Sequence, residues 1–155
     1  MATTSSAATL LHVALQDLHA VKEAQAARLP RLAAQCRDVA LRELVDVEAA
    51  RAAMHAARTR AVAANVSGPE NLWMAGILDD ATRDTQQTKP GRLLDIALIG
   101  AIRKAKAAEI VSSETAMALA REVNVSDLLV AVTANRTEEI ETDRGLKSRL
   151  ALLTP

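Results

Sequence analysis

Residues 11–32 read LHVALQDLHAVKEAQAARLPRL, and this stretch decides the fold. Leucines recur in it at every third or fourth position, which is the spacing of one face of an α-helix. The face is interrupted once by a cation, Lys22, and once by an amide, Gln25. Because an unpaired charge is costly in an apolar core, we expect other helices to bring polar side chains to Lys22.

The composition is that of a helical protein. Half of the 155 residues are apolar, yet Trp73 is the only Phe, Tyr or Trp, and the chain has only five glycines and four prolines. The apolar content is therefore mostly alanine and leucine, which are strong helix formers. We expect a single domain over residues 1–155, with residues 1–6 frayed.

Charge and cysteine content exclude several classes of partner and compartment. Nineteen basic and nineteen acidic side chains cancel and are mixed along the chain, so nucleic acid is not an expected partner. The first residues lack the basic start and apolar core of a signal peptide, and no apolar run approaches the roughly 20 residues that a membrane span requires, so we expect neither. Cys36 is the only cysteine, which excludes an internal disulfide framework. We expect a cytoplasmic protein.

Periodicity and capping signals predict four long helices and one short one. Ser5 or Ser6, Asp38 and Ser126 are expected N-caps, and Pro30 is expected to bend the first helix without ending it. The predicted helices cover about residues 7–35, 38–64, 70–83, 92–123 and 126–153.

The region between the second and third long helices differs from the rest. Ser67-Gly68-Pro69 and Lys89-Pro90-Gly91 are strong helix breakers around a short amphipathic piece. Leu72, Trp73 and Ile77 are expected on its apolar side, with Trp73 sealing one end of the core. A connection of this length can run back along a long helix, so the sequence predicts an all-α, ferritin-like four-helix bundle with a long crossover.

Polar residues interrupt the apolar face of each long helix near its middle. We expect them to form one buried layer in which the two lysines pair with Glu48 and Glu139. Further polar residues lie one or two turns away on the same helices. The expected layer is Lys22, Glu48, His55, Lys106, Glu109 and Glu139, with Arg136 and Asp143 close to it.

The layer fails the sequence test for a di-metal site. Bundles of this connectivity bind two metal ions through Glu-x-x-His pairs, and no glutamate here has histidine three residues later. His55 alone is placed to face the layer, as a ligand or as a hydrogen-bonded core histidine, whereas His12 and His19 are expected at the surface or at a helix edge. We therefore expect no metal, no cofactor, no small-molecule ligand and no catalytic residue.

Several segments resemble the bacterial YciE/YciF-type ferritin-like proteins. Residues 17–22 and 29–32 resemble the family's Asp-[Leu/Ile]-Tyr-x-x-Glu…Leu-Pro-Lys opening, and residues 71–77 resemble its Cys-x-x-Met-x-Gly-Leu segment. Residues 95–110 are similar to its Asp-x-x-Leu-Ile…Glu-His-Tyr-Glu-Ile helix, and residues 137–146 to the Glu-Glu…Asp…Leu pattern of its last helix. The resemblance implies a ferritin-like bundle, self-association and a link to bacterial stress responses without an established reaction.

Departures from the family pattern fall at the layer. Lys22 and Lys106 stand where family members carry acidic residues suited to a metal, His19 replaces a tyrosine, and Ala107-Ala108 replaces His-Tyr. We therefore expect a metal-free, non-enzymatic homodimer of stress-response type. Two alternatives remain open: a di-iron or manganese protein that uses the glutamates and His55 despite the lysines, and an interaction module that binds a partner helix or a membrane surface.

Overall fold

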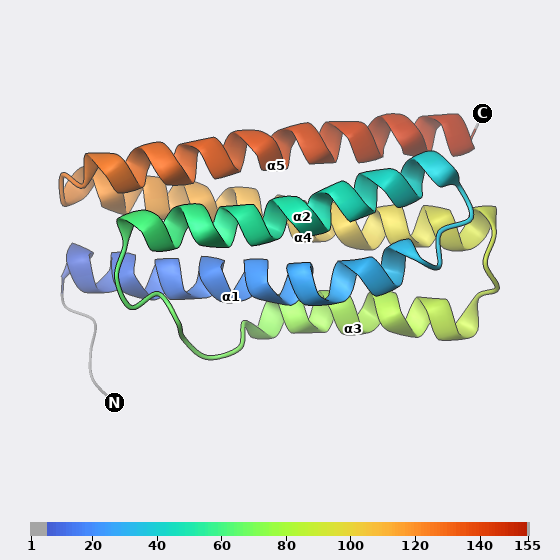
Figure 1. Ribbon diagram of the computed structural model, residues 1–155, viewed down its shortest axis with the longest axis horizontal. Helices are drawn as coiled ribbons and strands as arrows, with labels where there is room; N and C mark the ends of the chain where they lie inside the picture. Colours follow the sequence, from blue (N-terminus) through green and yellow to red (C-terminus); the bar gives the residue numbers. More distant parts are fainter. Residues whose placement is uncertain (1–5, 155) are drawn as a thin grey trace.

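The computed structural model describes residues 6–154, and all regular secondary structure in that range is helical. The four long helices form an antiparallel bundle in which α1 packs against α2 and α4, and α5 packs against the same two helices (Figure 1). The predicted all-α, ferritin-like bundle is confirmed. The helices are α1 (Ala7–Ala33), α2 (Val39–Val62), α3 (Leu72–Gln87), α4 (Arg92–Glu122) and α5 (Ser126–Leu153).

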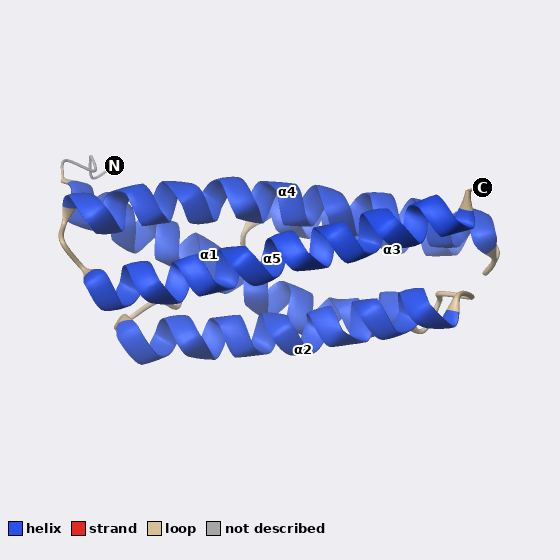
Figure 2. Cartoon of the chain, turned by 90° about the horizontal axis from the view of Figure 1, so that it is seen from above, coloured by secondary structure: helices blue, strands red, loops and turns tan. Residues whose placement is uncertain are grey.

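The short helix α3 lies within the predicted crossover between α2 and α4. It packs on α1 and α4, over the half of the bundle that holds the C-terminal end of α1 (Figure 1). Viewed from above, the short connections gather at the two ends of the molecule (Figure 2). The crossover therefore returns the chain along the length of the bundle and adds a fifth helix to one face.

Two of the predicted N-caps are confirmed. The side chains of Ser6 and Asp38 accept hydrogen bonds from backbone N–H groups three residues later, at 3.2 and 2.7 Å. Asn71 caps α3 in the same way at 2.9 Å. Pro30 lies inside α1 and does not end it. Of residues 1–6, which were expected to fray, Ser6 is the ordered N-cap of α1, and the other five lie outside the described part of the chain.

The predicted cap at Ser126 is wrong. Ser126 is already the first residue of α5, and Val125 occupies the cap position without a side-chain hydrogen bond. The chain turns one residue earlier than expected because Asn124 adopts a left-handed conformation with φ 56°. Asparagine tolerates this conformation better than most residues, and the turn lets the Val125 N–H bond to the carbonyl of Ala120 at 3.0 Å.

On α5, the buried side chains lie on one flank of Glu139, and the two polar residues predicted close to the layer lie on the other. Leu128, Asn135 and Thr142 are buried, while Arg136 and Asp143 are partly exposed and bind Glu114 and Arg103 near the surface. The prediction that Arg136 and Asp143 lie close to the layer is therefore wrong. Both residues lie roughly 40–60° around the helix from Glu139, which is enough to bring them to the edge of the buried face.

Two separate apolar clusters fill the core on either side of the layer. One lies under α3 and includes Leu29, Met74 and Leu98, and the other includes Leu15 and Leu128 at the opposite end. Trp73 is half-buried against the first cluster, as expected, whereas Leu72 is 81% exposed and the prediction that it faces inward is wrong. Leu72 is the first residue of α3, and its side chain faces solvent.

Candidate functional site

The structure brings the predicted polar residues together in the middle of the bundle. We call them the polar layer: Lys22 from α1, Glu48 and His55 from α2, Lys106 and Glu109 from α4, and Glu139 from α5. None is more than 4% exposed. All four long helices therefore contribute charged side chains to one region that water does not reach.

Lys106 lies at the centre of the polar layer. Its ammonium nitrogen donates to Glu139 Oε2 at 2.7 Å, to Glu109 Oε2 at 3.0 Å and to a carboxylate oxygen of Glu48. Gln25 Oε1 accepts a fourth contact at 3.1 Å. An ammonium group has only three N–H donors, so it cannot make a separate hydrogen bond to each of the four oxygens. The four oxygens surround the nitrogen much as ligands surround a metal cation.

Lys22 forms the second centre of positive charge. Its ammonium nitrogen donates to Glu109 Oε2 at 2.9 Å and to Glu139 Oε1. The two lysines were expected to pair with Glu48 and Glu139, and both do bond to Glu139. A contact between Lys22 and Glu48 does not occur among the described residues, because Glu48 is bound by Lys106 instead. Depth along a helix can be inferred from sequence, but which neighbours a long side chain reaches depends on the packing of the helices.

Two layer residues were missed by the analysis of sequence. Gln25, 1% exposed, donates from its amide nitrogen to Glu109 Oε1, and Thr142 donates to Glu48 Oε2 at 2.7 Å. Gln25 had a signal, since it interrupts the leucine face one turn after Lys22. Thr142 had none that distinguishes it from a surface threonine.

Two opposing effects act on the pKa values of the carboxyl groups in the layer. Burial raises these pKa values, and the neighbouring ammonium groups lower them. Burial raises the pKa of Glu109 to about 8, although Lys106 and Lys22 oppose the shift. Burial also acts on Glu139, but Lys106 and Lys22 outweigh it and hold the pKa of that carboxyl well below its usual range. For Lys106, the three surrounding carboxylates overcome desolvation and raise the pKa of the ammonium group.

His55 connects the layer to the surface. Its Nε2 lies 2.6 Å from Glu138 Oε2, and Arg58 donates to the other oxygen of Glu138 at 3.1 Å. Its Nδ1 lies 3.0 Å from Glu139 Oε1 without the alignment of a hydrogen bond, and no other described residue bonds to it. Desolvation would raise the pKa of Glu138, but the contacts with His55 and Arg58 lower it.

Of the two histidines expected at the surface or at a helix edge, His12 is exposed and His19 is buried at an edge. His19 is 2% exposed and its Nε2 lies 3.1 Å from the guanidinium of Arg60. It lies beside, and not on, the leucine face of α1. The contact between α1 and α2 buries this flank as well.

The residues of the polar layer do not fit a metal ion. Glu48, Glu109 and Glu139 can place one oxygen each within 4.8 Å of one another, which would suit a cation. The Lys106 ammonium group already bonds to all three carboxylates, and Lys22 bonds to two of them. A metal ion would have to displace an ammonium group and would be repelled by the other.

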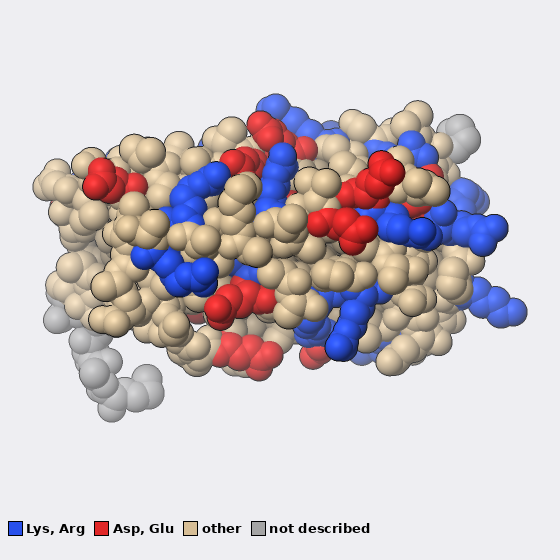
Figure 3. All heavy atoms as spheres, in the orientation of Figure 1, with Lys and Arg blue, Asp and Glu red and all other residues tan. Residues whose placement is uncertain are grey.

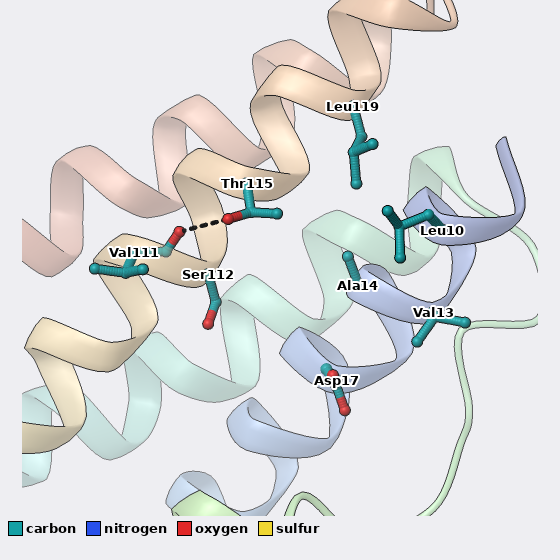
Figure 4. A pocket seen from close by; sticks show the side chains of 8 residues that line it. All are labelled: Leu10, Val13, Ala14, Asp17, Val111, Ser112, Thr115 and Leu119. Carbon is teal, nitrogen blue, oxygen red and sulfur yellow. Dashed lines mark hydrogen bonds between the residues drawn. The ribbon is translucent and has the colours of Figure 1, made fainter. Parts of the chain in front are cut away.

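A shallow apolar groove lies on the face of the bundle formed by α1 and α4. Helix α3 packs on this face and covers only part of it. Its volume is about 230 Å³, and Leu10 of α1 and Leu119 of α4 point toward one another across it (Figure 4). Three of its apolar side chains are strongly exposed: Leu10 at 45%, Val13 at 42% and Val111 at 63%. Asp17 is the one charged residue in its lining, so the groove is suited to an apolar contact.

The remaining surface carries mixed charge. Blue and red side chains alternate over the face seen in Figure 3, without a field of one sign in its middle. Among the described residues, no helix combines the length and the apolar character needed to cross a membrane.

Comparisons with known proteins agree with this fold. The family described as "Domain of unknown function (DUF892)" matches residues 6–154. The crystal structure of the E. coli stress protein YciF superposes with a TM-score of 0.91 at 19% identity, covering 97% of this chain and 98% of that chain. YcfI, a putative structural protein from Rhodopseudomonas palustris, superposes with a TM-score of 0.86 at 19% identity, covering 92% of this chain and 94% of that one. A comparison with curated protein sequences finds no match.

Proposed function

The chain belongs to the DUF892 family, and from this premise we propose that it is a non-enzymatic, metal-independent helical bundle of stress-response type. In this bundle, the ammonium groups of Lys22 and Lys106 supply positive charge in the place of a pair of bound cations. They hold the carboxylates of four packed helices together. The description of YciF as a stress protein supports the physiological part of this proposal.

One observation carries the proposal. Both ammonium groups bond to Glu109 and Glu139, so the two carboxylates bridge two cationic centres. Two unit charges about 4 Å apart interact by about 4 kcal/mol at the effective dielectric constant of a protein. Several such attractions offset the cost of burying the carboxylates, and the two ammonium groups occupy the positions at which a divalent cation would meet them.

Metal analysis tests the proposal directly. After expression in medium supplemented with iron and manganese, we expect the purified chain to hold far less than one metal ion per molecule. Replacing both lysines, as Lys22→Ala with Lys106→Ala, frees Glu48, Glu109 and Glu139 and should increase the bound metal. The measurement is elemental analysis after gel filtration.

The matched control is Lys104→Ala with Lys147→Ala, which removes two exposed lysines and the same net charge. It should leave the metal content unchanged. Near-stoichiometric iron or manganese in the unaltered chain would contradict a metal-independent bundle and favour the di-metal alternative.

The groove supports a second part of the proposal, that two copies of the chain form a dimer. Val13 and Val111 are exposed to solvent, and Asp17 is the one charged residue that lines the groove around them. Apolar side chains of this kind gain free energy when a partner excludes water from them, and an uncharged patch can face a second copy of itself without repulsion. We place the dimer contact on the part of the α1–α4 face that α3 leaves open.

Charged substitutions in the groove test the dimer. Val13→Asp with Val111→Asp should shift the chain from dimer to monomer, because two copies would bury four carboxylates in one contact. Multi-angle light scattering measures the change in molar mass. Val39→Asp, at an equally exposed valine on α2, should leave the dimer intact. A monomeric unaltered chain, or a dimer that both sets of variants retain, would refute this location.

A further inference from the structure

The charges of the polar layer do not balance. Lys22 and Lys106 supply two positive charges, while Glu48, Glu109 and Glu139 supply three negative ones when all are ionised. All five side chains are at most 5% exposed. A net charge buried this deeply is costly, so one more positive charge is required for a stable layer.

A proton is the cation that the layer can accommodate. Glu109 faces Lys22 from α1, Gln25 from α1, Lys106 from its own helix and Glu139 from α5, with Glu48 of α2 close by. Two carboxylates that share the same ammonium groups repel one another, and protonation of one relieves this repulsion. The raised pKa of Glu109 agrees with this assignment.

The layer also has a route to solvent, through His55. The ring is fully buried, and both of its nitrogens face carboxylates: Nε2 faces Glu138 and Nδ1 faces Glu139. Glu138 reaches the surface, with 23% of its side chain exposed, next to Arg58 of α2. A neutral imidazole carries one N–H and one lone pair, so a ring between two carboxylates can accept a proton on one side and release one on the other.

We propose that the polar layer is a binding site for one exchangeable proton, and that His55 carries this proton between Glu138 at the surface and Glu139 in the layer. A proton taken from water by Glu138 is donated to His55 Nε2, and the N–H on Nδ1 then passes its proton to Glu139. From there Glu109 receives it within the carboxylate cluster. No bond other than N–H and O–H bonds forms or breaks, and no electrons are transferred.

The position of the ring between two carboxylates is the observation that supports this route. Nε2 lies 2.6 Å from Glu138 Oε2 and Nδ1 lies 3.0 Å from Glu139 Oε1, so each ring nitrogen is within reach of a proton donor or acceptor. The inference rests on the metal-independent layer proposed above. Metal content is therefore measured on the same samples, so that a bound ion is recognised separately from a missing proton.

Infrared spectroscopy of the full-length chain tests the binding site. A protonated carboxyl group has a C=O stretching band that a carboxylate lacks, and we expect one such band at pH 6 that disappears in alkaline solution. The band should be lost in Glu109→Gln and retained in Glu141→Gln, which alters an exposed glutamate of α5. Absence of the band in the unaltered chain, or its persistence in Glu109→Gln, would overturn the proposal.

A rapid pH jump tests the route. The band should respond about tenfold or more slowly in His55→Gln and in Glu138→Gln than in the unaltered chain, with its amplitude preserved. Glu138→Gln changes a partly exposed residue and serves if His55→Gln does not fold. Response rates equal to that of Glu141→Gln in the variants that fold would show that the proton enters elsewhere.

Discussion

Replacing Lys106 by methionine is expected to lower the free energy of unfolding by about 3–5 kcal/mol, the cost of leaving buried charges without their partner. Lys106 is the largest fully buried side chain among residues 6–154, and three carboxylates bond to it. Methionine has a similar length, so the change removes the charge with little loss of packing. Urea denaturation followed by circular dichroism measures the effect.

The control for this substitution is Lys104→Met, two residues earlier on the same helix and exposed to solvent. It should change the free energy of unfolding by less than about 0.5 kcal/mol. Equal effects at positions 104 and 106 would mean that the buried ammonium group contributes no more than a surface lysine.

A double-mutant cycle resolves the pairing within the layer. Lys106→Met and Glu48→Gln should couple by about 0.5–3 kcal/mol, because the two side chains are in direct contact. The coupling energy between Lys22→Met and Glu48→Gln should be smaller, because these two side chains interact only through other residues of the layer. The sequence suggested that Lys22 and Glu48 pair, and the cycle distinguishes that arrangement from the observed one.

The second large effect is a loss of stability as the pH rises toward 8. Glu109 has a pKa of about 8 in the folded chain against an ordinary value of 4.5, so the folded state binds more protons than the unfolded state over this range. The free energy of unfolding should fall with rising pH between these values, by up to about 1.4 kcal/mol per pH unit. Thermal unfolding in a series of buffers measures this slope.

Glu109→Gln provides the matched comparison. The amide is neutral at every pH, so the variant should lack the slope and should be more stable than the unaltered chain at pH 8. Glu139 acts in the opposite sense: its lowered pKa contributes stability above about 4.5 that is lost as the pH falls further. A slope between pH 5 and 8 that survives in Glu109→Gln would assign the pH dependence to another group.

The fold could be predicted closely because its signals are local. Leucine spacing, Ser6 and Asp38 as caps, and the breakers around residues 67–69 and 89–91 each act within a few residues. The length of the crossover then leaves few ways to connect four helices. The errors arose where local signals compete, as at Asn124, where a left-handed turn moved the start of α5.

The layer could be predicted only in part. Lys22 and Lys106 could be identified because each interrupts an apolar helix face. Their depth in the bundle could be predicted because each lies near the middle of its helix. His19 and Thr142 lie beside the faces and gave no such signal, although both are buried. Burial on the flank of a helix depends on how closely the neighbouring helix approaches. The periodicity of one helix carries no information about that distance.

The amino-acid sequence by itself determined that four apolar helices pack with charged residues at one depth, because periodicity and capping are properties of short segments. The tertiary structure alone decided which charges meet. It places Lys106, rather than Lys22, on Glu48, brings Gln25 into the layer, and leaves His55 between an exposed and a buried carboxylate. These contacts join residues far apart in the chain, and their geometry is fixed only when all four helices are packed.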